Sequence, residues 1–188
     1  MEIDYGSNIL NVSAKLFKEH GLGAVTMGNI AEHANISKNS LKEKYQDKEA
    51  IIFEIASIFF KEQGDICNNL QSFNNAKEEF IQLMKHCSTF LNDFTPSIAA
   101  EIKNNYPKVW KLFLQHRDTV IIEKIKSNFT KGIQEGTYRS DLNIDITAKS
   151  CIDQMQFAFN QLIFPLEDYS APEVLSVIVK NILYSISK

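Results

Sequence analysis

The sequence predicts an all-α protein, in which an N-terminal three-helix helix-turn-helix domain is joined by a long helix to a C-terminal helical domain. Three observations support this class. Apolar residues recur every three or four positions along most of the 188-residue chain, which is the period of one face of a helix. Alternation with period two, the mark of strands, is almost absent. The seven glycines and four prolines fall between the periodic stretches, where helices begin and end.

The composition is that of a folded chain rather than a disordered one. Hydrophobic residues make up 44% of the sequence and the formal net charge is −3, so the chain is too apolar and too weakly charged for intrinsic disorder. The longest apolar stretch, residues 51–60, is interrupted by Glu54 and is too short to span a bilayer. The acidic start is unlike a secretory signal, and the three cysteines show no metal or disulfide spacing. We expect a cytoplasmic protein with reduced thiols, no metal and no cofactor.

The first helix is expected over about Asp4–His20. Leu10, Ala14 and Phe17 recur at helical spacing and form its apolar face. Gly21 follows directly, and a glycine just past the last turn is a common way to end a helix.

The second helix is short and strongly capped. Thr26 is a suitable N-cap for a helix over Met27–Ala34, and Val25 and Ile30 hold the two positions of a hydrophobic staple. Asn35 can adopt the left-handed conformation that ends such a helix.

A third helix of about eight residues begins after its N-cap, Ser37, with Leu41 and Tyr45 as its large inward side chains. Two short helices joined by a tight turn after a longer supporting helix match the helix-turn-helix arrangement. Between Ser37 and Lys48 there are four lysines and two acids. The chain therefore carries a local basic patch despite its negative net charge, with a solvated helix face as the plain alternative.

The remaining helices are marked by caps and prolines, which makes nine in all. We expect them over residues 47–71 with Asp47 as N-cap, after Asn74–Asn75, from Thr95–Pro96, from Tyr106–Pro107 to about Glu135, over residues 144–163, and from a capping box at Ser170–Glu173.

The N-terminal motif also matches a known family. The matching residues are Ile9–Leu10, Ala14, Leu16–Phe17, His20–Gly21, Val25–Thr26, Ile30–Ala31, Ala34, Ile36–Lys38, Ser40–Leu41, Tyr45 and Asp47–Ala50. Over residues 9–56 the chain resembles the N-terminal DNA-binding domain of TetR-type bacterial transcriptional regulators. The resemblance implies a DNA-binding domain over residues 1–50 and an effector-binding and dimerisation domain over residues 51–188. It also implies a homodimer that binds double-stranded operator DNA and is released by a small molecule.

By this resemblance, Thr26 and Lys48 would contact phosphates, and Ser40 would contact backbone or base. The chain departs from the family at Asn39, which could read adenine, and at Gly28, which cannot reach a base. Lys42 can contact a phosphate, whereas Glu43 would be repelled by phosphates unless it accepts a hydrogen bond from a cytosine amino group. The expected DNA-binding residues are Thr26, Lys38, Asn39, Ser40, Lys42, Glu43, Lys44, Tyr45 and Lys48.

The C-terminal helices suggest two further surfaces. The last two helices are apolar over much of their circumference, which indicates either a buried core or, as we favour, a four-helix bundle with a second subunit. Its expected residues are Phe159, Ile163, Val174, Ile178 and Ile182. Aromatic residues with a few polar ones predict a site for a largely apolar effector, with plain core as the alternative. The candidates are Phe90, Tyr106, Trp110, Phe113, Gln154 and Phe157.

Other classes of function have weaker support. The sequence shows no spacing typical of a catalytic nucleophile and no glycine-rich phosphate loop, so we expect no enzyme. His86 and Cys87 are adjacent, and neighbours on a helix diverge by about 100°, which disfavours a shared metal. A helical small-molecule-binding or partner-binding protein with weak or no DNA binding is the alternative that Glu43 and the negative net charge favour.

Overall fold

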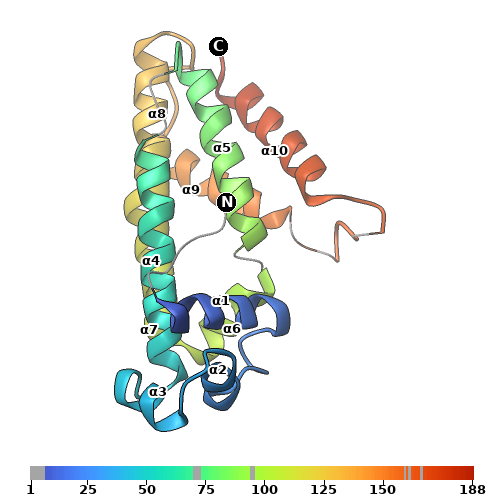
Figure 1. Cartoon of the computed structure of the whole chain (residues 1–188). Coiled ribbons are helices and arrows are strands. Elements are labelled where there is room, and N and C mark those ends of the chain that lie inside the picture. Colours follow the sequence, from blue (N-terminus) through green and yellow to red (C-terminus); the bar gives the residue numbers. More distant parts are fainter. Residues whose placement is uncertain (1–6, 70–72, 94–95, 159, 161, 166) are drawn as a thin grey trace. The chain divides into compact units, whose positions relative to one another are not determined.

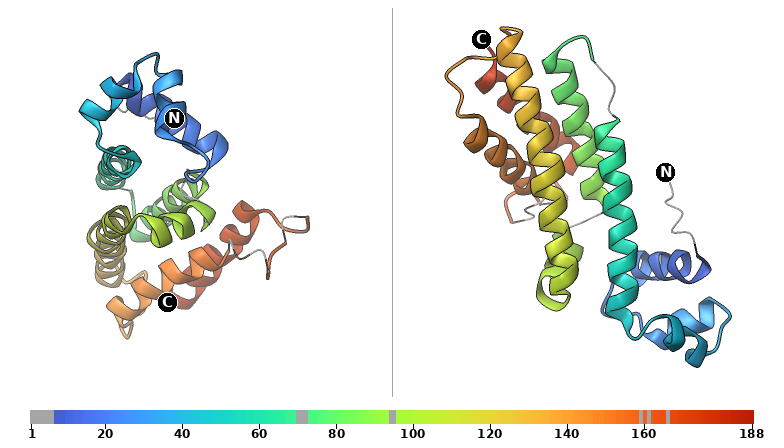
Figure 2. Two further views of the ribbon diagram at one scale, coloured as in Figure 1. Left: turned by 90° about the horizontal axis from the view of Figure 1, so that it is seen from below. Right: turned by 90° about the vertical axis from the view of Figure 1, so that its left-hand side faces the viewer.

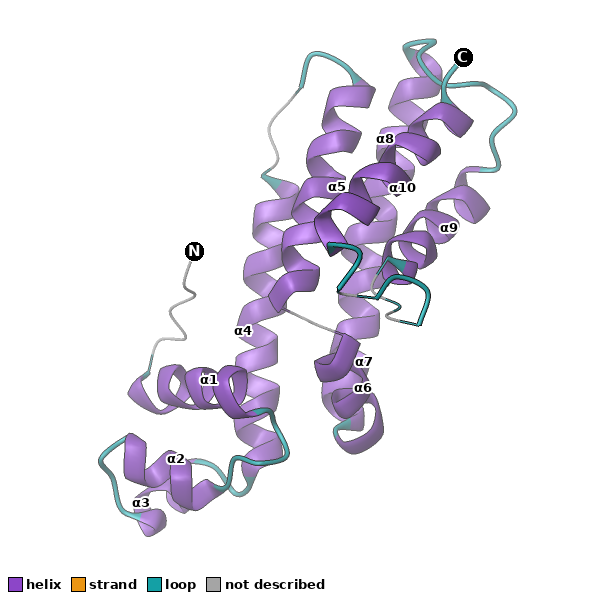
Figure 3. Cartoon of the chain, turned by 90° about the vertical axis from the view of Figure 1, so that its right-hand side faces the viewer, coloured by secondary structure: helices purple, strands orange, loops and turns teal. Residues whose placement is uncertain are grey.

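The computed structural model describes residues 7–69, 73–93, 96–158, 160, 162–165 and 167–188, and these contain helices and loops but no strand beyond one isolated bridge (Figures 1 and 3). The elements are α1 (Asn8–His20), α2 (Met27–His33), α3 (Lys38–Lys44), α4 (Lys48–Asn68), α5 (Ala76–Asp93), α6 (Pro96–Asn105), α7 (Pro107–His116), the π-helix η1 (Arg117–Ile122), α8 (Glu123–Gln134), α9 (Ile144–Phe157) and α10 (Ala171–Ile186). Since α7, η1 and α8 follow without a break, the described residues form the nine helical rods that the sequence predicts. None of these helices is both long and apolar enough to cross a bilayer.

Contacts divide the chain into two units. The first comprises Met1–Gln63 and Ser97–Gln115, and the second comprises Gly64–Pro96 and His116–Lys188. Two long rods, α4 and the continuous α7–η1–α8 helix, therefore contribute residues to both units. The functional boundary expected at residue 50 follows the helix-turn-helix motif rather than this division, and it stays a prediction.

In the first unit, α1 begins at Ser7, whose hydroxyl accepts a hydrogen bond from the Leu10 amide at 3.2 Å. The expected start at Asp4 lies outside the described residues. Gly21 ends the helix with φ +80°, a conformation that favours glycine. The predicted end of α1 is thus confirmed.

Helix α2 packs against α1, and α3 packs against α2, through a small apolar core. Val25 and Ile30 are both buried, as the staple requires, and Leu41 is fully buried on α3. Asn35 has φ +56° and supplies the turn between α2 and α3. The expected helix-turn-helix is therefore present, with Val25, Ile30 and Leu41 facing inward.

The second unit is a ring of four helices around one core. Helix α5 packs against α8 and α10, and α9 packs against the same two helices (Figure 2). Phe80, Phe129 and Tyr138 are fully buried at its centre, with the rings of Phe80 and Phe129 5.6 Å apart. The apolar stripes read from the sequence therefore face one another inside a single chain.

A short polar network links the start of α5 to α8. The Ala76 amide donates to a Glu135 carboxylate oxygen at 2.8 Å, and the Ala76 carbonyl accepts from the Asn128 side chain at 2.8 Å. The Tyr138 hydroxyl donates to the Asn128 amide oxygen at 3.3 Å. Asn128 is completely buried, so these bonds satisfy polar groups that water does not reach.

The predicted helix over residues 144–163 is too long, because α9 ends at Phe157. The apolar residues beyond it look like a helical continuation but belong to the connector to α10. There the Asn160 side-chain oxygen accepts a hydrogen bond from the Leu162 amide at 3.1 Å. A local side-chain bond of this kind competes with the helical ladder. Phe164 turns back so that its ring lies 5.6 Å from that of Phe157.

Two other details differ from the sequence expectation. Ser170 is the N-cap of α10, but its side chain makes no capping hydrogen bond, so the predicted capping box with Glu173 is wrong. The rod from Pro107 onward contains the six-residue π-helix η1, which apolar spacing does not reveal. Thr95, the expected N-cap of α6, lies outside the described residues.

Candidate nucleic-acid interface

Helix α3 buries one apolar side chain and exposes its polar side chains to solvent. Leu41 is fully buried, whereas Lys38, Asn39, Ser40, Lys42, Glu43 and Lys44 are all exposed. The helix begins at Ser37, whose hydroxyl accepts from the Ser40 amide at 3.0 Å and lies 2.8 Å from the Ser40 hydroxyl. A helix held by one side chain can present the rest to a partner. The exposed set is the one that the sequence predicts, with three lysines and one glutamate.

Thr26 stands at the beginning of α2 in a reciprocal capping arrangement. Its hydroxyl accepts from the Asn29 amide at 3.2 Å and donates to the Asn29 side-chain oxygen at 2.6 Å, which also accepts from the Thr26 amide at 2.9 Å. Thr26 is exposed, as expected for a phosphate-contacting residue. The role of Asn29 was missed, although a polar residue three positions after an N-cap is the sequence signal for it.

Lys48 is placed differently from its expected role at a phosphate. Its ammonium donates to the Leu22 carbonyl at 2.6 Å and to the Val25 carbonyl at 2.9 Å. An ammonium group has three donors, so two of them hold the loop between α1 and α2 against the start of α4. Asp47 caps the same helix by accepting from the Ala50 amide at 2.9 Å, as predicted. The structure therefore gives Lys48 a structural role that the sequence did not indicate.

Tyr45 is also committed to the fold. It is half-buried at the end of α3, and its hydroxyl hydrogen-bonds with the side chains of Glu54 and Ser7. Burial, with the Glu54 carboxylate as the next contribution, raises the pKa of Tyr45 to about 12. Its phenol therefore ties α3 to α4, instead of standing free on the surface as the DNA-contact prediction requires.

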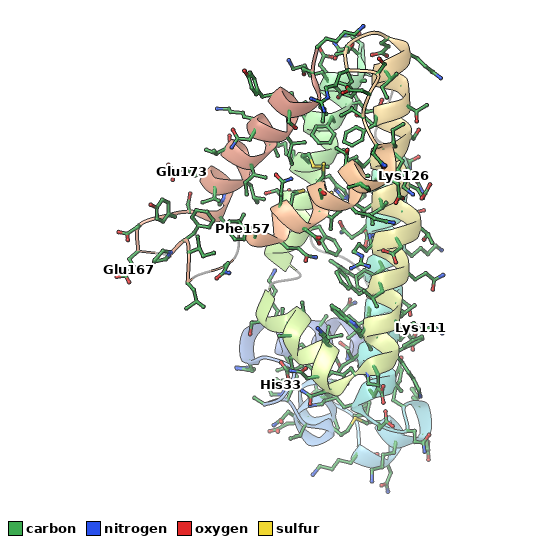
Figure 4. The ribbon with its side chains drawn as sticks, turned by 180° about the vertical axis from the view of Figure 1, so that it is seen from behind. His33, Lys111, Lys126, Phe157, Glu167 and Glu173 are labelled. Carbon is green, nitrogen blue, oxygen red and sulfur yellow. The ribbon has the colours of Figure 1, made fainter. Side chains whose placement is uncertain are left out.

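The six candidate effector residues divide between the two units. In the first, Tyr106 is half-buried and the rings of Trp110 and Phe113 lie 4.9 Å apart. In the second, Phe90 stacks on the His116 ring with centroids 5.8 Å apart. Gln154 is exposed on α9, and so is Phe157 on the same helix (Figure 4). The six do not form one cluster within either unit, so their assignment to an effector stays a prediction.

His116 is a buried neutral histidine at the end of α7. Burial, followed by the nearby His86, lowers the pKa of His116 to about 4. The imidazole is therefore uncharged at neutral pH, which suits its position against an aromatic ring.

The candidate dimer residues are only partly available at the surface. Val174 and Ile182 are buried in the second unit's own core, and Ile178 is half-buried. Ile163 is 47% exposed, and Phe159 lies outside the described residues. The exposed apolar side chains on α10 are Val177 and Tyr184, which sequence reasoning missed because both lie within an apolar run that surrounds the helix. Phe157, Leu162 and Tyr169 add to the exposed apolar surface of this unit.

The three thiols are buried in the second unit. Cys67, Cys87 and Cys151 are free and buried, and burial raises the pKa of each thiol. A high pKa keeps a thiol in its unreactive protonated form. No cluster of three or more histidine, cysteine, aspartate or glutamate side chains suited to a metal occurs in the described part of the chain.

Comparisons with known proteins agree with this geometry. Residues 9–55 match the family model described as bacterial regulatory proteins, tetR family. The transcriptional repressor KstR2 of Rhodococcus jostii is 24% identical over 144 residues, which cover 74% of this chain and 71% of that protein. A putative transcriptional regulator from Saccharomonospora viridis in complex with choline has the same fold, with a TM-score of 0.84, 18% identity and 96% coverage of both chains. FadR from Bacillus subtilis, in complex with stearoyl-CoA, gives a TM-score of 0.72, 13% identity, and coverage of 95% of this chain and 98% of that one.

Proposed function

We propose that this chain is a DNA-binding transcriptional regulator of the TetR family, a repressor that binds a near-palindromic operator as a homodimer and leaves it when a small-molecule effector binds. One observation carries the proposal. Helix α3 is anchored by a fully buried Leu41 and exposes six consecutive or near-consecutive polar side chains. A short, polar, lysine-rich helix held in this way is suited to lie in the major groove of a duplex.

The exposed residues divide into two kinds of contact. Lys42 and Lys44 supply charge to phosphates, which gives affinity without sequence information. Asn39 can bond the paired donor and acceptor of adenine, and Glu43 can accept from a cytosine amino group. Glu43 then acts as a selective residue, because any other base leaves its carboxylate without a donor beside the duplex.

The homodimer is supported by apolar side chains that the single chain leaves uncovered. Val177 and Tyr184 on α10 are 52% and 90% exposed, and Leu162 in the connector is 95% exposed. A homodimer with two-fold symmetry has two α3 helices, one for each half-site of a near-palindrome, and half-sites on successive major grooves lie about 34–36 Å apart. Size-exclusion chromatography with light scattering should give twice the 21.5 kDa chain mass. A V177E/Y184E double variant should run as a monomer, whereas a dimer unaffected by it would move the interface elsewhere.

The effector is proposed to be largely apolar. Proteins of the same fold hold ligands as different as choline and stearoyl-CoA, so side chains rather than the fold select the ligand. Within the first unit, Trp110 and Phe113, whose rings lie 4.9 Å apart, offer aromatic surface to such a molecule. Release follows if the effector favours a conformation whose two α3 helices no longer match the operator, because ligand binding then shifts the population away from the DNA-bound form.

The decisive experiment is selection of duplexes from a random library with the full-length protein. We expect enrichment of a near-palindrome, and fluorescence anisotropy on it should show an affinity that falls steeply with salt. Asn39→Ala should weaken binding to the selected sequence and relax its preference at one position in each half-site. Lys85→Met is the matched control, because Lys85 is an exposed lysine on α5, in the second unit. If no duplex is enriched, the helical small-molecule-binding alternative replaces this proposal.

A further inference from the structure

The end of the Lys38 side chain lies beside Gly28 in the helix-turn-helix. If Gly28 carried a Cβ atom, the nearest atoms would be Cε and Nζ of Lys38, at 3.2 and 3.3 Å. The long side chain that opens α3 therefore lies across the first turn of α2, over the position where residue 28 has no side chain. Both residues border an open depression on the surface of this motif. The absence of a side chain at position 28 is thus what gives the Lys38 stem its path.

The third atom near this point is the Thr26 hydroxyl oxygen, 3.5 Å from the same Cβ position. The ammonium of Lys38 and the hydroxyl of Thr26 therefore both border the space beside Gly28, within 3.5 Å of that Cβ position, although Lys38 belongs to α3 and Thr26 caps α2. The hydrogen of the Thr26 hydroxyl is directed at the Asn29 side chain, 2.6 Å away. The Lys38 ammonium brings three donors and a full positive charge to the place where Thr26 alone has little to give.

We propose that Gly28 is a positioning residue, which lets Lys38 reach back over α2 and bind the same DNA phosphate as Thr26. This inference rests on the proposed DNA-binding function. It assigns Lys38 to backbone contact beside α2, and it leaves base reading on α3 to Asn39 and Glu43. A bulky side chain at position 28 would displace the lysine from this path, whereas a single methyl group would stand 3.2 Å from the stem and require only a small shift of it.

A double-mutant cycle tests this coupling on the selected duplex. Lys38→Met keeps the length of the stem and removes the charge. Because a dimer carries two copies, the slope of log affinity against log salt should fall by about 2, at ~0.9 for each phosphate contact. Gly28→Leu should give a similar loss, and adding Lys38→Met to Gly28→Leu should then change the slope little. Gly28→Ala, whose single methyl group a flexible stem can avoid, should have a much smaller effect.

Lys44→Met provides the matched comparison within α3. Lys44 is exposed, and it is not among the atoms nearest to Gly28. The reduction in salt slope caused by Lys44→Met should therefore add to the reduction caused by Gly28→Leu. Circular dichroism and thermal melting establish that each variant is folded, and Gly28→Met, with a flexible unbranched side chain, replaces Gly28→Leu in the cycle if leucine is not tolerated. Additive behaviour of Lys38→Met and Gly28→Leu, with wild-type protein binding normally, would overturn this inference alone. Failure of the wild type to bind any duplex would remove the proposed function as well.

Discussion

Replacing Lys48 by methionine should destabilise the N-terminal motif as well as affect DNA binding. The ammonium makes two charged hydrogen bonds, at 2.6 and 2.9 Å, to the carbonyls of Leu22 and Val25. A hydrogen bond to a charged group contributes about 1.5–3 kcal/mol, and Lys48 is half-buried. Since water can partly replace the lost donors, we expect the free energy of unfolding to fall by roughly 2–4 kcal/mol. Methionine keeps the apolar stem, so the loss reports on the ammonium.

Urea unfolding followed by circular dichroism measures this change, with Lys44→Met as the control. Lys44 is fully on the surface, so its replacement should leave the urea midpoint within the range of ordinary surface substitutions, about 0.5 kcal/mol. The same two variants are then compared for DNA affinity at several salt concentrations. If the Lys48→Met protein is as stable as the wild type but its DNA affinity depends less on salt, the structural role of Lys48 is refuted. Lys48 would then be assigned to a DNA phosphate.

Three further predictions concern the second unit. Gly132→Ala should lower the free energy of unfolding by about 2–3 kcal/mol, because the added methyl group would overlap the buried ring of Tyr138. Gly64→Ala is the control: its methyl group would make only ordinary contacts, so it should raise the free energy of unfolding by about 0.5–1 kcal/mol. Thermal melts distinguish the two variants. Asn128→Ala should lower the urea midpoint by the equivalent of roughly 2–4 kcal/mol, because it leaves two buried polar groups without a partner. Because burial and the neighbouring His86 hold the pKa of His116 at about 4 in the folded chain, against an ordinary 6.5, the unfolded chain takes up the proton first as pH falls. Its contribution to stability is therefore full above pH 6.5 and is lost towards pH 4. Urea midpoints of His116→Gln should depend less on pH across this window, and an unchanged dependence would contradict the assignment.

The helices were predictable wherever a cap or a special backbone conformation marks them. Gly21 and Asn35 adopt the positive φ angles that their positions suggested, and Asp47 caps α4. The end of α9 was not predictable, because apolar residues after Phe157 continue the helical spacing while Asn160 turns the chain. Hydrophobic spacing indicates which residues are buried, but it does not indicate where a side-chain hydrogen bond competes with the helix.

The exposed face of helix α3 was predictable from the sequence, whereas the contacts around it were not. Exposure of Asn39 and Lys42 follows from one buried position in a short amphipathic helix. The bonds of Lys48 to the loop before α2, and the path of Lys38 over Gly28, join residues ten to twenty-six positions apart. Such contacts depend on how the helices cross, which local sequence patterns do not encode.

The polar network at Ala76 has a consequence for the order in which the second unit assembles. The first amide of α5 is bonded to a side chain from the end of α8, 59 residues away in sequence, so it has this partner only once those two helices have docked. In a native-state hydrogen-exchange experiment, this one proton should become protected together with the α5–α8 contact rather than with α5 alone. The resonance of this one amide would then report on the docking of α5 with α8.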